Sequence, residues 1–293
     1  GSGISLFIAA GVSQAVFVGA LSFLPAAVSG EPVGAIPKFI WNLTVGDGPI
    51  KAIYSLVPLI FTLVVFFVVV YIEGMKIELP LAYGRARGLG ARYPIKFLYV
   101  SNMPVILASA VLLNLQLFGL FMSNAGISFL GTYQNNQPVD GIAYFLTALH
   151  SPQFFNGYDN YLAVITQPKE LMHIFTYGIA LIALCIIFGW FWIESTGMGA
   201  SDVAAQLERA GLQIPGFRQD PRVTQKILEK YIPVITILGS FFVGVLAWFA
   251  DITGALGTGT GILLTVGIVY RFYEELAQQQ LFSMYPGLKN LVS

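Results

Sequence analysis

The chain has 293 residues, of which 56% are hydrophobic and 10% charged, and its mean hydropathy is +0.74. This composition excludes an ordinary soluble domain and indicates a polytopic membrane protein. The formal net charge is zero, so the chain as a whole has no electrostatic preference for nucleic acid. The single cysteine, Cys185, excludes an internal disulfide.

Six apolar runs are predicted to be membrane-spanning helices, because each is long and lacks Asp, Glu, Lys and Arg. In chain order they are Ile4–Leu24, Ala52–Ile72, Phe97–Met122, Leu171–Ile193, Tyr231–Ala250 and Ile252–Tyr270. The third run carries polar side chains, including Asn102, Asn114 and Gln116, which hydrocarbon disfavours. We therefore expect this helix to face an interior, within an all-α membrane protein that is a polytopic bundle of six transmembrane helices.

The basic residues predict the orientation of the chain. The connections 73–96 and 194–230 hold five basic residues each and the C-terminal tail holds two, whereas the connections on the other side hold the remaining three. Positively charged connections stay in the cytoplasm. The sequence therefore predicts that residues 73–96, residues 194–230 and the C-terminus are cytoplasmic, and that the protein lies in the cell membrane.

The connection 194–230 is predicted to be a basic hairpin. Residues 200–212 have the pattern of a short helix, residues 214–222 are rich in turn formers, and residues 223–230 continue as a helix into the fifth run. One interpretation is that the charges only fix topology. The other is that the hairpin binds an acidic or RNA-rich partner.

The connections on the non-cytoplasmic side give weaker indications of structure and function. Gly141–His150 is predicted to be a short interfacial helix, too short to span a membrane. Asn42-Leu43-Thr44 fits a glycosylation sequon, a pattern that is common by chance.

The sequence contains few candidate groups for catalysis or cofactor binding. His150 and His173 have no spacing that makes a metal site with Cys185. The glycine-rich stretch Gly257–Gly261 lacks the Lys-Ser/Thr of a phosphate loop, so we interpret it as a site of close helix packing. Ion-coupled carriers usually keep charged groups at mid-membrane. The six runs contain no Asp, Glu, Lys or Arg, which favours a passive conduit without a cofactor.

Four motifs carry further information: Asn102–Leu107, Ile214–Arg218 with Asp220–Arg222, Gly254–Leu264 and the opening Gly1–Gln14. Together they resemble the archaeal branch of the SecY family of protein-conducting channels. The family has ten spans in two halves of five, and the resemblance begins at the fifth span. It implies that the first four spans and the plug are not part of this sequence. Residues 1–50 would be the last helix of the N-terminal half with an external hinge connection, and residues 51–293 the C-terminal half.

The resemblance implies a pore that passes unfolded polypeptide through a ring of apolar side chains. The ring residues in this chain would be Ile4, Ile8, Met103, Ile106 and Leu264. Such a ring makes no strong hydrogen bonds to a passing peptide and disfavours continuous water.

The resemblance also implies a lateral gate, partners and docking residues. Asn114 resembles a polar gate position through which apolar segments leave for the lipid bilayer. Arg85, Arg87, Arg218 and Arg222 would dock the ribosome, with Arg218 foremost. Implied partners are small SecE-type and Sec-beta-type membrane subunits, the translating ribosome, signal peptides and nascent polypeptides.

Two other functional classes remain as alternatives. A small-solute transporter predicts ionisable groups inside the membrane, and a membrane-embedded enzyme predicts a clustered catalytic set. Neither pattern is seen in the six runs, so a protein-translocation channel is the preferred hypothesis.

Overall fold

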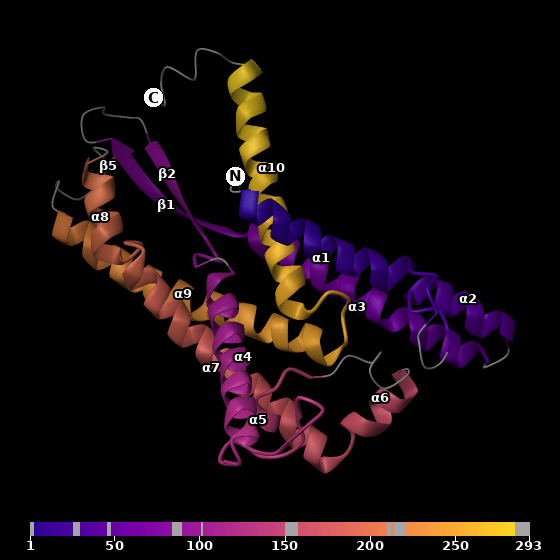
Figure 1. Ribbon diagram of the computed structural model, residues 1–293. Coiled ribbons are helices and arrows are strands. Elements are labelled where there is room, and N and C mark those ends of the chain that lie inside the picture. Colours follow the sequence, from indigo (N-terminus) through magenta and orange to yellow (C-terminus); the bar gives the residue numbers. More distant parts are fainter. Residues whose placement is uncertain are drawn as a thin grey trace. The chain divides into compact units, whose positions relative to one another are not determined.

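The computed structural model describes residues 3–25, 30–45, 48–83, 90–100, 102–149, 158–209, 212–213 and 221–284. The chain forms two compact units, one of Gly1–Glu73 with Ala255–Ser293 and the other of Gly74–Gly254 (Figure 1). The predicted boundary at residue 50 concerns the halves of a longer protein and stays a prediction.

The first unit consists of helices α1 (Gly3–Leu21), α2 (Ala35–Val45), α3 (Pro49–Gly74) and α10 (Gly259–Met284), and α1 packs against α2 and α10. The buried Asn42 ties α2 to α3, because its Nδ2 donates to Ser55 Oγ at 2.9 Å. With 4% of its surface exposed, Asn42 is not an accessible glycosylation acceptor in this structure.

The link into α10 packs closely on α1 and α3. Gly254, Gly257 and Thr258 all have positive φ, so α10 begins at Gly259 and not near residue 252 as the sequence predicted. A Cβ on Gly257 would lie 2.9 Å from a methyl of Val16 in α1, and the Leu256 N–H donates to Thr62 Oγ1 of α3 at 2.8 Å. The glycine-rich stretch therefore serves close packing, as interpreted from the sequence.

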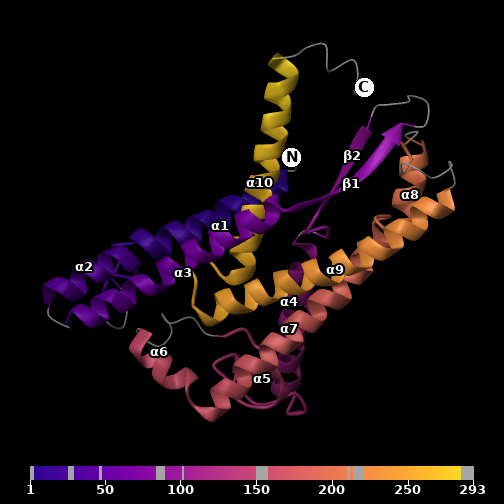
Figure 2. The same ribbon diagram turned by 180° about the vertical axis from the view of Figure 1, so that it is seen from behind.

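The second unit is built on α7 (Pro168–Ser195) and α9 (Pro221–Ile252), which lie side by side, with α4 (Met103–Asn124) packed against α7 (Figures 1 and 2). Shorter helices are α5 (Ile142–Phe145), α6 (Tyr158–Ile165) and α8 (Ala200–Arg209). Because Pro104 lies in its first turn and strand structure runs to Lys96, α4 begins at Met103 and not at the predicted Phe97.

One end of this unit contains a sheet and an apolar core. Antiparallel strands β1 (Lys76–Tyr83) and β2 (Gly90–Lys96) pair along their length, and β5 (Leu212–Gln213) adds to the end of β1. These strands were not among the predicted elements, although Lys76-Ile77-Glu78-Leu79 alternates polar and apolar residues. The helix predicted at 200–212 is present as α8, but it ends at Arg209 and Leu212 belongs to β5; the helix predicted at 223–230 is the start of α9. The core contains Ile95, Val100, Ile193, Val203, Ala204, Leu207, Leu228, Ile232 and Ile235.

Four helical stretches among the described residues are long and apolar enough to cross a membrane: Pro49–Gly74, Met103–Asn124, Pro168–Arg209 and Arg222–Ile252. The apolar part of α1, Leu6–Leu21, is shorter. In α10, charged residues begin at Arg271, part-way along the helix. Each of the six predicted runs nevertheless corresponds to a helix in the observed order.

Candidate functional site

The five predicted ring residues come from both units. Ile8 of α1 and Leu264 of α10 belong to the first unit, and Met103 and Ile106 of α4 belong to the second. Ile8 and Met103 are each 38% exposed, and the other two are partly buried. Ile4 lies in α1, but its side chain is outside the described residues. The ring therefore stays a prediction.

Helix α4, which carries the predicted gate residue, is buried unevenly. Its first half packs through Val105, Ala108 and Leu112, whereas Phe118 and Phe121 in its second half are 59% and 69% exposed. Asn114 lies at the start of this exposed half and is itself exposed. The amide is thus on an apolar, unburied helix surface, where it is free to contact lipid or another chain segment.

Three of the four predicted docking arginines, Arg85, Arg87 and Arg218, lie outside the described residues. Arg222 lies in the first turn of α9, and its side chain is exposed. The ribosome-docking assignment stays a prediction for all four.

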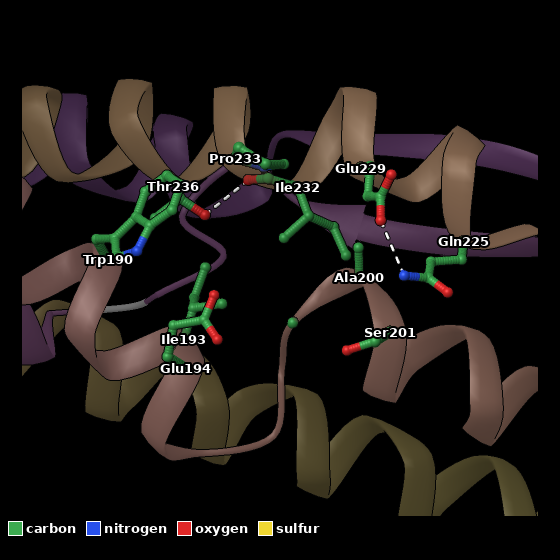
Figure 3. Close-up of a pocket in the computed structure, with 11 residues that line it drawn as sticks. Trp190, Ile193, Glu194, Ala200, Ser201, Gln225, Glu229, Ile232, Pro233 and Thr236 are labelled. Carbon is green, nitrogen blue, oxygen red and sulfur yellow. Dashed lines mark hydrogen bonds between the residues drawn. The ribbon is translucent and has the colours of Figure 1, made fainter.

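A crevice of about 240 Å³, which no sequence pattern predicted, lies between α7, α8 and α9 (Figure 3). Glu194 and Glu229 lie on its walls with the indole of Trp190, and Gln225 Nε2 donates to Glu229 Oε1 at 2.9 Å. No basic side chain is among the eleven lining residues. Carboxylates beside an exposed indole can accept a basic side chain.

A larger, mainly apolar cavity of about 370 Å³ lies inside the first unit between α1, α3 and α10. Val12, Phe66 and Val266 contribute apolar walls, and Ser13 and Thr265 contribute hydroxyl groups. A surface of this kind suits an apolar helix more than a charged solute.

Residues 125–149, which follow α4, form a cap over the start of α7. His173 is 2% exposed, and its Nε2 lies 2.9 Å from the carbonyl oxygen of Thr147. Its ring packs against Tyr144 at a centroid distance of 4.6 Å, and the Tyr144 hydroxyl donates to Glu170. Burial, the hydrogen bond to Glu170 and the charge of that carboxylate raise the pKa of Tyr144. His173 is therefore a packing residue, and no group of three potential metal ligands occurs among the described residues.

Comparison with known proteins identifies the family. A family model described as SecY matches residues 1–273. The chain is 48% identical to the protein translocase subunit SecY of Methanothermobacter thermautotrophicus, in an alignment that covers 100% of this chain and 62% of that relative.

Two solved structures are similar over nearly all of the chain. One, from work on how the plug domain of a SecY protein stabilises the closed state of its translocation channel, is 44% identical with a TM-score of 0.77 and covers 98% of this chain and 61% of its own. The other, Sec61 in the canine ribosome-channel complex from the endoplasmic reticulum, is 43% identical with a TM-score of 0.72 and covers 98% and 60%.

The helices and the comparisons together define a multi-pass α-helical membrane protein, whose fold is similar to part of the solved SecY translocation channel. The chain spans about 62% of the length of the curated relatives that it matches. It belongs to the SecY family.

Proposed function

We propose that this chain is part of the central pore-forming subunit of the general protein translocation channel. It would supply the helices from the fifth span to the tenth, passing unfolded secretory polypeptides across the membrane and releasing apolar segments sideways into lipid. The observation that carries this proposal is the match to SecY over residues 1–273 at up to 48% identity among the curated relatives compared. The role is that of a passive conduit and not of an enzyme.

The pore is proposed to close around a ring that includes Ile4, Ile8, Met103, Ile106 and Leu264. Apolar side chains offer a moving peptide no strong hydrogen bond, so sequences of many kinds can slide past. The partial exposure of Ile8 and Met103 supports this role, because a ring residue must reach an open space.

The proposed orientation places residues 73–96, residues 194–230 and the C-terminus in the cytoplasm, following the basic residues. Residues 1–50 would end the N-terminal half of the channel, and residues 51–293 would form its C-terminal half. Arg85, Arg87, Arg218 and Arg222 would then face the translating ribosome, a partner supported by the likeness to Sec61 in a ribosome-channel complex.

The gate is proposed to lie along the exposed half of α4, at Asn114. A polar group in an apolar seam weakens its packing and lowers the cost of separating it. Further proposed partners are signal peptides, nascent polypeptides and small SecE-type and Sec-beta-type subunits. The apolar cavity of the first unit offers such a subunit a surface for one helix.

The test uses a chimaera in which residues 1–273 replace the matching part of the Methanothermobacter SecY, reconstituted with its partner subunits. A photoreactive amino acid at Ile106 should crosslink to a stalled secretory chain. The same probe at Ile179, which is 68% exposed on α7, is the control and should crosslink mainly to lipid. Equal crosslinking at both positions, or none at Ile106, would exclude a pore at this place.

A further inference from the structure

The β3–β4 hairpin of the cap contacts the exposed half of α4 through Tyr133. The Tyr133 hydroxyl donates to the backbone carbonyl oxygen of Gln116 at 2.9 Å. Gly119, one turn further along α4, makes this contact possible, because a Cβ at that position would overlap the Tyr133 hydroxyl. Partial burial raises the pKa of Tyr133, so its hydroxyl stays protonated and remains a donor.

The hairpin that carries Tyr133 is tight. Strand β3 (Tyr133–Gln134) pairs with β4 (Gln137–Pro138), and the two residues between them, Asn135 and Asn136, have φ of 50° and 63°. Two positive φ values in a two-residue loop define a type I′ turn, whose twist matches that of the strands. The turn therefore fixes the direction in which Tyr133 points.

The other side of the cap is held by the beginning of α7. Lys169 Nζ donates to the Val139 carbonyl at 3.3 Å and lies 4.5 Å from the centre of the Tyr144 ring. His173 Nε2 forms a hydrogen bond with the Thr147 carbonyl oxygen at 2.9 Å. Residues 133–147 thus form a continuous bridge from Gln116 of α4 to the first turns of α7, and Figures 1 and 2 both show α5 beside these two helices.

This bridge contacts the half of α4 whose large apolar side chains are mostly exposed in the described structure. Val105, Ala108 and Leu112 fix the first half by burial, whereas Leu113, Leu117, Phe118 and Phe121 are between 45% and 69% exposed. Gly119 is the buried residue of the second half, and Tyr133 covers it.

We propose that Tyr133, seated on Gly119, is a positioning residue that holds the second half of α4 to α7 and so sets the cost of opening the gate. This inference rests on the proposed function, in which α4 lines the lateral exit. One net hydrogen bond contributes about 1 kcal/mol, which is about a fivefold change in an equilibrium constant. Loss of the Tyr133 hydroxyl should favour gate opening by that factor.

The experiment compares Tyr133→Phe, Gly119→Ala and the double variant in the reconstituted chimaera, with Tyr231→Phe as a control because Tyr231 is 42% exposed on α9. Translocation is measured for a precursor with its normal signal sequence and for one whose signal carries fewer leucines. Tyr133→Phe should leave the first rate unchanged and raise the second about fivefold. Gly119→Ala should do at least as much, because its methyl group displaces the hydroxyl.

The double variant separates positioning from general damage. Without the hydroxyl, the ring carbons lie 3.2 and 3.3 Å from an added Cβ, so a shift of a few tenths of an ångström admits the methyl group. The double variant should therefore behave like Tyr133→Phe alone. If the effects of the two single changes instead added up in the double variant, and the translocation rate of the normal precursor fell, Gly119 would only maintain the fold.

Amide hydrogen exchange in α4 tests the structural bridge separately from its role in gating. Tyr133→Phe should speed exchange at residues 117–122 about fivefold and leave residues 103–112 unchanged. Unchanged exchange would exclude the bridge. Faster exchange with an unchanged response to the weakened signal would retain the bridge but exclude its role in gating. A parent chimaera that translocates neither precursor would instead overturn the proposed function, and exchange would still decide the bridge.

Discussion

Replacing His173 tests how strongly the cap over α7 is attached. His173→Phe keeps a ring beside Tyr144 and Phe145 but loses the hydrogen bond from Nε2 to the Thr147 carbonyl. Thr147 is 8% exposed, so its carbonyl oxygen would be left largely without water. Leaving a buried acceptor unsatisfied costs about 1–3 kcal/mol, and we expect about 2 kcal/mol less local stability for residues 142–149.

A second replacement separates the hydrogen bond from the ring contacts. His173→Gln retains an N–H donor but loses the ring packing, which contributes about 0.5–1.5 kcal/mol. We therefore expect a loss of about 1 kcal/mol, smaller than that for Phe. Met172→Leu, at a neighbouring position that is 59% exposed, should change nothing measurable.

Amide hydrogen exchange of the reconstituted chimaera measures these differences as local opening free energies. A loss below about 0.5 kcal/mol for His173→Phe would show that Thr147 finds another partner. A larger loss for Gln than for Phe would show that packing, and not the hydrogen bond, holds the cap.

Four further predictions concern the proposed pore and its surroundings. Asn114→Leu should stabilise the closed gate and raise the signal hydrophobicity needed for translocation; an unchanged threshold would exclude the gate role. Arg218→Glu should weaken binding to translating ribosomes and reduce the salt dependence of the remaining affinity, measured by cosedimentation at several ionic strengths. Ile106→Asp should raise chloride conductance in planar bilayers, because a charge in the ring favours continuous water. The raised pKa of Tyr144 means that the unfolded segment loses its phenolic proton first, so the local stability of the cap should fall as pH rises past about 10, and Tyr144→Phe should reduce that fall.

The sequence alone predicted the helices that define the class of protein. Length and hydropathy are local properties, so the six apolar runs could be read without knowledge of their neighbours. The start of α8 and the continuation of α9 from the basic hairpin followed from capping and turn residues in the same way. The family motifs, such as Asn102–Leu107, were also readable, and the match over residues 1–273 confirms the family.

Features that depend on distant residues could not be read in this way. The sequon at Asn42 gave no sign that its amide is buried against Ser55, because burial depends on how α2 meets α3. Tyr133 had no special spacing, and its role emerges only when a type I′ turn places its hydroxyl on Gln116. Sequence determined which segments are helical and apolar, whereas tertiary structure decided which polar groups meet. A hydrogen bond needs both partners within about 3 Å, and only the folded chain brings them there.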